Sequence, residues 1–314
     1  MTEHIYNLTN ARLSRPSQVT IGIFDGVHRG HHHLIRKLVS DARRADRLAV
    51  VLTFFPHPDV VIRGLTGPYY LTTPEQKAAL LMELGVDYVI TQTFDDAVRQ
   101  IRAADFVDQL REHLNMAGLM VGPDFAMGYK REGNVDFLRA QSQQKGFELH
   151  IADIVSHEGQ AISSTAIRKA LEAGDVDQAR TLLGRSYSVT GPVVHGAKRG
   201  RQIGYPTANV EVWAQQVIPA NGIYASWVHL NGERFMAATS LGVRPTFDGQ
   251  DITVEPYILD FDREIYGEQL TVTFEKRLRD ELKFDSLEAL IKQIGADVDE
   301  SRKFLSQQAI VDRP

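Results

Sequence analysis

Two hydrophobic patterns follow one another along the chain, and they predict two kinds of structure. In the first half, short apolar runs at residues 19–24, 48–54, 88–91, 118–122 and 147–154 alternate with segments whose apolar residues recur at helical spacing. The short runs are typical of buried strands, and the spaced segments are typical of helices that pack on a sheet. This alternation predicts an α/β domain with a parallel sheet. Such sheets bind ligands beyond the carboxyl ends of their strands, so we expect a site in the loop after the first predicted strand.

The helices expected in this half cover residues 33–44, 74–84, 103–114, 134–145, 163–171 and 176–183. The second half has short strands separated by turn residues, at residues 188–196, 207–212, 222–230, 233–242, 253–261 and 269–278. Asn231-Gly232 lies between two apolar runs and indicates a hairpin turn, because both residues tolerate positive φ. The pattern predicts a small antiparallel β-barrel and a C-terminal helix at residues 286–307, with Asp285 and Glu288 as its cap pair. The predicted domains are residues 1–184 and 185–314.

Composition and charge narrow the classes of function. The 314 residues exceed the ~150 of an average domain, and 43% hydrophobic with 24% charged residues is typical of a soluble globular protein. Without a long apolar run or an N-terminal h-region, the sequence predicts a cytoplasmic protein that makes no membrane contact. The absence of cysteine excludes disulfides, thiolate metal sites and cysteine nucleophiles. The net charge of -5 argues against a nucleic-acid binder, which needs a broad basic surface, but it allows a small phosphorylated ligand.

The first candidate site follows the first predicted strand. The segment DGVHRGH at residues 25–31 leads from this strand into a helical pattern. Gly26 and Gly30 allow the backbone to approach a ligand closely, and the helix start offers N–H groups and the positive end of the helix dipole to an anion. His28 and His31 can donate to phosphate oxygens as negative charge builds, which suits nucleotidyl transfer. Surface histidines in a polar turn, or a zinc site in the histidine cluster, are alternative interpretations.

A second helix start lies at residues 162–168. The segment ISSTAIR brings hydroxyls and one arginine to it. Taken alone, hydroxyls at such a position are typical N-caps. Combined with the histidine turn in the same α/β unit, the two helix N-termini fit opposite ends of a triphosphate.

The most informative stretch of the second half is GAKRGRQIGYPTAN at residues 196–209. Its glycines and cations predict a flexible basic loop that folds over phosphates, although it lacks the ending of a Walker loop. Thr207 and Asn209 alternate along the next strand, so both face one side. Their oxygens suit Mg2+, which keeps waters and substrate phosphates as its other ligands. A hairpin with a solvated basic tip explains the glycines and the charges, but not the Pro-Thr-Ala-Asn exit.

Together these segments resemble the bacterial bifunctional riboflavin kinase/FMN adenylyltransferase family. Residues 22–31 and 162–168 are similar to its transferase motifs, and residues 196–209 are similar to its kinase motif. The similarity continues in order through NGIYA at residues 221–225 and covers about residues 19–305. The resemblance implies a nucleotidyltransferase-like α/β domain followed by a riboflavin kinase barrel. It also implies riboflavin, FMN, FAD and ATP as ligands, with ATP as co-substrate and Mg2+ as cofactor.

The resemblance implies roles for individual residues. In the transferase half, His28 and His31 are the expected catalytic residues, and Asp25 is expected to orient the turn. The expected ATP and phosphate contacts of that half are Gly22, Phe24, Asp25, Gly26, Gly30, Ser164, Thr165 and Arg168. Those of the kinase half are Gly196, Lys198, Gly200, Arg201, Gly204 and Pro206, with Thr207 and Asn209 at the metal.

The flavin contacts implied by the resemblance are Phe54, Asp124, Phe125 and Arg277. Arg277 opens RLRDELKF at residues 277–284, which is similar to the flavin-side loop of the family, and the sequence does not decide which side chain of that loop touches the ring. Phe54 belongs to TFFPHP at residues 53–58, where aromatic faces can stack on an isoalloxazine ring. A buried strand end with a proline turn explains the same segment equally well. Met127 departs from the family pattern, because many members carry a second aromatic residue there.

Glu255 is the expected catalytic base of the kinase half, because the catalytic glutamate of the family occupies that place. Phosphoryl transfer to an alcohol benefits from a base within hydrogen-bond reach of the hydroxyl proton. Without the resemblance, an isolated glutamate on a strand is read as a solvated surface residue. Pro256 removes a ladder donor, so this strand is expected to be an edge or to carry a bulge.

Two alternative functions remain open. One is an enzyme with a single active half, such as an FMN adenylyltransferase whose barrel only binds flavin. The other is a nucleic-acid-binding protein, because histidine-glycine-histidine turns also occur in class I aminoacyl-tRNA synthetases. The acidic net charge and the lack of a Lys-rich second signature count against that class. The sequence does not define the oligomeric state, and a weak homo-oligomer is compatible with it.

Overall fold

The computed structural model describes residues 2–153, 156–157, 160–196, 199–246 and 249–311. The chain folds into two compact units. The first comprises Met1–Gly67 and Leu71–Ser164, and the second comprises Pro68–Tyr70 and Thr165–Pro314. Helix α8 (Val176–Leu183) therefore lies in the second unit. The domain border predicted after residue 184 stays a prediction.

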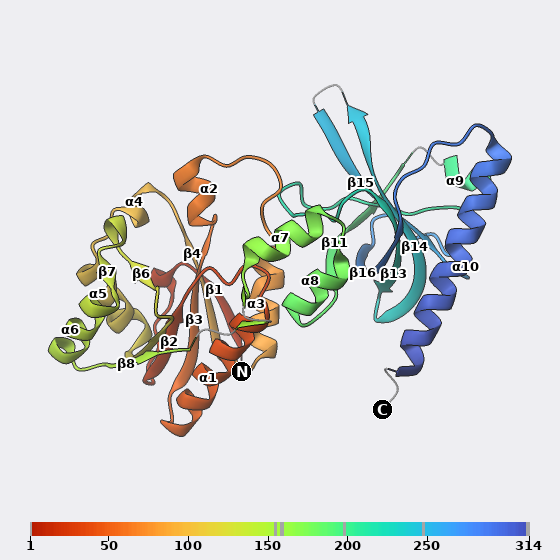
Figure 1. Cartoon of the computed structure of the whole chain (residues 1–314). Helices are drawn as coiled ribbons and strands as arrows, with labels where there is room; N and C mark the ends of the chain where they lie inside the picture. Colours follow the sequence, from red (N-terminus) through yellow and green to blue (C-terminus); the bar gives the residue numbers. More distant parts are fainter. Residues whose placement is uncertain (1, 154–155, 158–159, 197–198, 247–248, 312–314) are drawn as a thin grey trace. The chain divides into compact units, whose positions relative to one another are not determined.

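The first unit is built on a parallel sheet, as the sequence predicts (Figure 1). Its strands lie in the order β1-β4-β3-β2-β5-β8 and cover Glu3–Tyr6 (β1), Ser17–Ile21 (β2), Leu48–Phe55 (β3), Tyr88–Thr93 (β4), Met116–Val121 (β5) and Glu148–Ile151 (β8). The chain adds β3 and β4 on one side of β2, and then β5 and β8 on the other. The strand order thus reverses beside β2, and ligands of α/β sheets bind at such a point.

Helices cover both faces of this sheet. They are α1 (Arg29–Arg44) and α3 (Pro74–Glu83) on one face and α5 (Ala103–Leu114) and α6 (Val135–Lys145) on the other. The unit also contains the short helices α2 (Pro58–Arg63) and α4 (Asp96–Arg99). The short elements of the unit are η1 (Leu8–Asn10), β6 (Ala126–Met127), η2 (Tyr129–Arg131), β7 (Gly133–Asn134), β9 (Ser156–His157) and β10 (Gln160–Ala161). Successive strand residues enter opposite cores: Val50 and Leu52 pack with α5 and α6, whereas Val51 packs with α1 and α3. Burial on both faces explains why the strands are continuous apolar runs.

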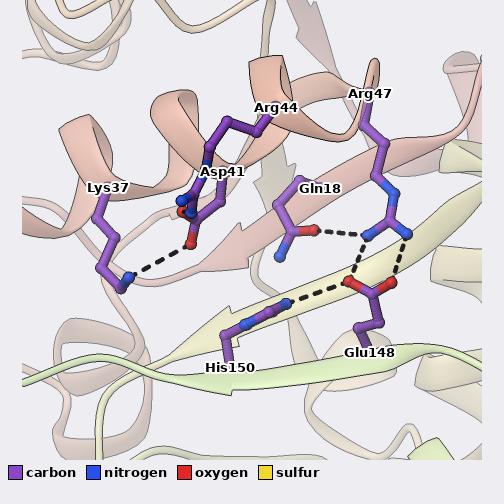
Figure 2. A network of polar contacts seen from close by, with 7 residues as sticks. All are labelled: Gln18, Lys37, Asp41, Arg44, Arg47, Glu148 and His150. Carbon is purple, nitrogen blue, oxygen red and sulfur yellow. Dashed lines mark hydrogen bonds and ion pairs between the residues drawn. The ribbon is translucent and has the colours of Figure 1, made fainter.

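A polar network fixes one end of the sheet, as Figure 2 shows. Arg47 donates to both carboxylate oxygens of Glu148 at 2.8 and 2.7 Å, and to Gln18 Oε1 at 3.1 Å. The hydrogen bonds from Arg47 lower the pKa of Glu148 to about 2. Gln18 and Glu148 lie at the beginnings of β2 and β8. The network therefore joins the edge strand to the centre of the sheet at the end opposite to the loop after β2.

The second unit is a closed antiparallel barrel, which confirms the predicted fold (Figure 1). The barrel order is β11-β12-β15-β14-β13-β16, with strands Tyr187–Val194 (β11), Asn209–Val210 (β12), Gly222–Leu230 (β13), Glu233–Thr246 (β14), Gly249–Ile258 (β15) and Gln269–Arg279 (β16). Its helices are α7 (Ser164–Glu172), α8, α9 (Arg199–Gln202) and α10 (Leu287–Val311). The hairpin prediction is confirmed, because Asn231 and Gly232 join β13 to β14 with φ of 50° and 83°.

Helix α10 packs on the barrel through a cluster of Ala225, Trp227 and Leu305. Its predicted cap is wrong by one residue: Ser286, not Asp285, accepts the hydrogen bond from a first-turn N–H, that of Ala289, at 3.1 Å. The helix begins at Leu287, so the residue directly before it has the cap position. In the part of the chain that the structure describes, no helix is long and apolar enough to cross a membrane.

The strand that carries Pro256 is not a sheet edge, which corrects one expectation. Strand β15 lies between β12 and β14, and its register with β14 runs without a bulge from Gly249 to Ile258. The Pro256 carbonyl accepts from Ala208 N at 3.0 Å. In an extended chain the N–H and C=O groups of one residue point to the same neighbouring strand. The side on which Pro256 lacks an N–H group therefore faces the segment before the two-residue strand β12. The ladder is already incomplete on that side, which makes proline tolerable.

Candidate active sites

The loop after β2 has an unusual backbone. Phe24, Gly26 and Val27 have φ angles of 52°, 78° and 39°. Glycine adopts such angles readily, but a β-branched residue such as Val27 does so only under strain. Strain of this kind persists only where surrounding contacts hold it, and it concentrates at functional sites. The loop is therefore a candidate site on its geometry alone.

Tertiary contacts of Asp25 hold this loop. Its carboxylate accepts from the backbone N–H of Leu71 at 3.0 and 3.1 Å. Its backbone carbonyl accepts from the Ser164 hydroxyl at 2.9 Å. Asp25 thus has the contacts of a residue that shapes the turn. Because the Ser164 hydroxyl donates its proton to this carbonyl, its oxygen can act towards other groups only as a hydrogen-bond acceptor.

Helix α1 begins with a stacked pair of histidines. His28 is the N-cap, and its Nδ1 accepts from the His31 backbone N at 3.3 Å. The two imidazole rings stack at 3.6 Å with an interplanar angle of 16°. Gly30 leaves room for this arrangement, because a Cβ there would lie 3.2 Å from the His28 ring. Because His28 Nδ1 accepts this hydrogen bond, Nε2 is the ring nitrogen that can carry a proton and donate to an anion.

His31 is neutral in this environment. Burial lowers its pKa well below 6.5, and the nearby Lys77, together with any positive charge on His28 and His32, acts in the same direction. Its Nδ1 is buried and has no hydrogen-bond partner among the described residues. A buried polar atom of this kind at a helix N-terminus is a place for a polar atom of a ligand.

We expect His31 to make the stability of the first unit fall as the pH drops below about 6.5. In that range the unfolded chain binds a proton that the folded chain does not, so the free energy of unfolding decreases with falling pH. Above the unfolded pKa neither state is protonated, and the contribution of His31 does not change. Thermal unfolding midpoints between about pH 5 and pH 7.5 measure this effect. His31→Asn should flatten the dependence, whereas the exposed His33 offers the control His33→Asn. An equal slope in wild type and His31→Asn would contradict the expectation.

A cavity of about 730 Å³ adjoins this loop in the first unit. Gly22 and three predicted flavin contacts, Phe54, Asp124 and Phe125, line it together. Met127, where the family pattern departs, also lines it. The structure therefore brings together sequence segments that lie about a hundred residues apart, around a space of the size that small-molecule sites have.

The second helix start is divided between the units. Ser164 contacts Asp25 in the first unit, whereas Thr165 and Arg168 belong to the second. Arg168 is 9% exposed, its Nε donates to the Tyr69 carbonyl at 2.6 Å, and its guanidinium lies 4.1 Å from the centre of the Tyr69 ring. Arg168 therefore anchors residues 68–70 in the second unit.

Two adjoining cavities lie in the barrel unit. One, of about 300 Å³, is lined by Glu255 and Tyr257, and the other, of about 350 Å³, is lined by Arg201 and Pro206. Both are lined by Gly200 and Thr207. Two cavities that share a hydroxyl residue, with Glu255 in one of them and Arg201 in the other, are an arrangement for transferring a group between two ligands.

Comparison with known proteins agrees with this division into two sites. Residues 10–166 match the family model described as FAD synthetase, and residues 183–305 match the one described as riboflavin kinase. A curated relative from Listeria monocytogenes, named bifunctional riboflavin kinase/FMN adenylyltransferase, is 38% identical over 92% of each chain. A relative of the same name from Escherichia coli is 37% identical over 96% of each chain. The chain belongs to this bifunctional family.

The solved structures add the fold of a related chain. A crystal structure described as a macrolide-efflux protein from Streptococcus pneumoniae has a TM-score of 0.86 and 33% identity. The match covers 96% of this chain and 98% of that one. The bifunctional-family fold is therefore shared over nearly the full length of both chains.

Local geometry explains the glycines in the loop at residues 196–209, which lies in the part that matches riboflavin kinase. A Cβ at Gly196 would lie 2.2 Å from the Asn209 side chain, and one at Gly200 would lie 2.2 Å from the Tyr205 carbonyl oxygen. Gly204 has a φ of 83°. Each position therefore excludes or disfavours a side chain. Lys198, which was expected to contact phosphate, lies outside the described residues.

We expect Gly200→Ala to reduce riboflavin phosphorylation by about 100-fold, because the backbone beside Thr207 must move and displacements of about 1 Å have such effects. The matched control is Gly232→Ala, at a hairpin glycine with a φ of 83° and no atom within 4 Å of its Cβ position. That change should cost about 1 kcal/mol of stability and leave the rate unchanged. Initial rates of FMN formation and thermal midpoints measure both effects. Equal kinase rates in the two variants would refute the steric argument.

The donor set of the kinase site fits magnesium. Among the described residues, no group of three or more histidines, aspartates and glutamates is placed to hold a metal ion. Thr207, which lines both cavities, and Asn209, which lies against Gly196, offer hydroxyl and amide oxygens instead. Oxygen donors that leave room for phosphates and water are those Mg2+ prefers.

Strand β16, which borders the cavity beside Glu255, carries two arginines with different surroundings. Arg277 donates to the Asn221 carbonyl at 2.6 Å and is not among the residues that line the cavity beside Glu255. Arg279 does line it, and is held by Asp297 through hydrogen bonds of 2.8 and 2.6 Å. Arg277 as a flavin contact stays a prediction, and Arg279 is the one of the two that lines this cavity. The two arginines lie two residues apart in β16, which places them on one face of a regular strand, so the sequence pattern offers no means of choosing between them.

Proposed function

We propose that the two reactions of the family are divided between the two halves of this chain. The sheet domain adenylylates FMN to FAD, and the barrel domain phosphorylates riboflavin to FMN, with ATP as co-substrate in both. We place the border between them after residue 184. The observation that carries the kinase assignment is the pair of cavities that meet at Thr207, with Glu255 in only one of them.

In adenylylation an oxygen of the FMN phosphate attacks the α-phosphorus of ATP, and pyrophosphate leaves. The transition state gathers negative charge on the phosphoryl oxygens. The N-terminus of α1 and the Nε2–H group of His28 are suited to stabilise that charge, because they are fixed before the substrate binds. The neutral His31 supplies a second polar contact. Gly22, Gly26 and Gly30 allow close approach, Phe24 and Asp25 shape the loop, and Thr165 and Arg168 are further proposed phosphate donors.

The cavity beside this loop is the proposed site of the flavin ring. Phe54 and Phe125 offer apolar faces for an isoalloxazine ring, and Asp124 offers acceptors for its polar edge. Met127 supplies a polarizable contact in place of an aromatic one. In the barrel we propose Arg279, rather than Arg277, as the arginine on the flavin side.

In phosphorylation the ribityl 5'-hydroxyl of riboflavin attacks the γ-phosphorus of ATP, and ADP leaves. Glu255 accepts the hydroxyl proton, and the nucleotide binds in the cavity that Arg201 and Pro206 line. Thr207 and Asn209 are the proposed residues that hold Mg2+. The bound ion would offset charge on the ATP phosphates.

Other properties follow from composition. We propose that the chain acts in the cytoplasm, binds neither nucleic acid nor membranes, and self-associates weakly if at all. The net charge of -5 supports the second point, because nucleic-acid binding needs basic surface. Filter binding with RNA at moderate salt and sedimentation at several concentrations test these statements.

Incubation with riboflavin, ATP and Mg2+, followed by chromatography, tests the whole assignment. FMN appearing first and FAD later is the expected result. A chain that makes only one of the two products is an enzyme with a single active half. The absence of both products would overturn the proposal.

A further inference from the structure

Lys77 is a buried charge that none of the motifs contains. Its side chain is 5% exposed and lies on the same face of α3 as Leu81. Its Nζ donates to the Ile23 carbonyl at 3.1 Å, the Thr53 hydroxyl at 2.9 Å and the Phe54 carbonyl at 3.3 Å. An ammonium group has three donors, so all of them are satisfied. Lysine is almost never buried in this way without a specific reason.

The three oxygens share one location, the carboxyl ends of two neighbouring strands. Ile23 follows β2 and precedes the strained residues Phe24 and Val27. Thr53 and Phe54 lie near the carboxyl end of strand β3, and the Thr53 hydroxyl also donates to the Ile23 carbonyl at 2.8 Å. Ile23 and Phe54 both line the cavity beside the loop. Lys77 therefore connects the start of the phosphate loop to the wall of the flavin cavity.

The charge of Lys77 also acts on the site. Burial lowers its pKa to about 8, and the attraction of Asp25 opposes that shift, so the ammonium is charged at neutral pH. That charge contributes to the lowered pKa of His31. The positive charge of Lys77 thus favours the neutral form of the His31 imidazole and attracts a negatively charged ligand at the loop.

We propose that Lys77 is a positioning residue for adenylylation, which fixes the strained loop relative to the end of β3 and so aligns the phosphate-binding helix start with the flavin cavity. This proposal rests on the assignment of adenylylation to the sheet domain. It requires no contact between Lys77 and substrate. Binding of ATP and the reaction then depend on different properties of the loop. ATP binding needs the start of α1, whereas the reaction also needs that helix start to be aligned with FMN.

Lys77→Met tests the proposal by keeping the length of the side chain and removing the ammonium. We expect kcat for FAD formation from supplied FMN to fall about 100-fold, as for a misplacement of about 1 Å, and KM for ATP to change much less. Riboflavin phosphorylation by the same sample should continue at the wild-type rate. Lys37→Met is the control, since the Lys37 side chain is 41% exposed on α1 of the same domain. Adenylylation by folded Lys77→Met within about threefold of wild type would overturn the proposal.

The chain contains no cysteine, which permits a chemical rescue. In Lys77→Cys the introduced thiol is unique, and 2-bromoethylamine alkylates it before refolding. The thiolate carbon–sulfur bond forms as bromide leaves, and an ammonium returns at nearly the original distance from the backbone. The thermal unfolding midpoint of each sample, compared with that of the wild type, reports refolding of the sheet domain that carries residue 77. Recovery of FAD formation supports the proposal, and complete alkylation without recovery in a sample with the wild-type thermal midpoint contradicts it.

Thr53→Val covers the case in which Lys77→Met does not fold. This isosteric change keeps the lysine and removes the hydroxyl that joins it to Ile23. Losing one such hydrogen bond should lower kcat for adenylylation about tenfold. A wild-type kcat for Thr53→Val would overturn the proposal in that case. A wild-type enzyme that forms no FAD would instead refute the assignment of the domain.

Discussion

Replacing Glu255 by glutamine is expected to reduce riboflavin phosphorylation by about 10²- to 10⁴-fold, the range that a general base contributes. The amide preserves size and hydrogen-bonding capacity but cannot take the proton of the ribityl hydroxyl. Glu255 is half-buried in β15 and lines the cavity that shares Thr207 with the proposed nucleotide cavity. FAD formation from supplied FMN should be unchanged, because that reaction is assigned to the other domain.

The control for this substitution is Glu300→Gln on α10. Glu300 pairs with Lys276 at 3.2 Å, and both side chains are largely exposed. Exposed pairs contribute little, so neither reaction should change. Initial rates of both reactions and a thermal midpoint for each variant complete the comparison. If folded Glu255→Gln lost both reactions, the division of labour would be wrong. If it kept its kinase rate, Glu255 would not be the base.

Helices with clear termini could be predicted to the residue. The predicted range 103–114 coincides with α5, and Asn115 after it has a φ of 48°. The predicted range 176–183 coincides with α8, and Gly184 after it has a φ of 79°. Residues that adopt positive φ readily end a helix, so the sequence contains the stop signal.

Strands at the edge of the sheet or next to the site could not be predicted as well. Strand β1 covers Glu3–Tyr6, pairs only with β4 and is half-exposed, so it has no long apolar run. The run at residues 19–24 was expected to be a strand throughout, but β2 ends at Ile21. Its last residues leave the sheet for the strained loop, where tertiary contacts override the apolar pattern.

Site residues that belong to a local sequence motif could be predicted. Site residues that only the tertiary structure brings together could not. Glycines, histidines and the Thr-Ala-Asn exit are recognisable because they are local. Lys77 differs from a solvated lysine only by lying four residues before Leu81 on the buried face of α3. That spacing is the one signal that could have found it. Its three acceptors come from other elements, which the sequence does not bring together.

His28→Asn should abolish most adenylylation while preserving the fold. Asparagine is among the best N-cap residues, so its side-chain oxygen can replace Nδ1 as acceptor for the His31 backbone N. The shorter side chain does not carry a donor to the position of Nε2. Removing one donor to a transition-state oxyanion costs about 10²- to 10³-fold in kcat. FAD formation from FMN should fall by that factor, and FMN formation from riboflavin should stay at the wild-type rate.

His28→Ala separates the cap from the chemistry. It removes both the acceptor and the donor, so it should lose activity like His28→Asn and also about 1 kcal/mol of stability. Thermal midpoints of the two variants measure the cap alone, and their adenylylation rates measure the donor alone. Equal activity loss with unequal stability is the expected pattern. Adenylylation at the wild-type rate in His28→Asn, with activity lost only in His28→Ala, would reduce His28 to a helix cap and would leave the chemistry to His31 and the helix dipole.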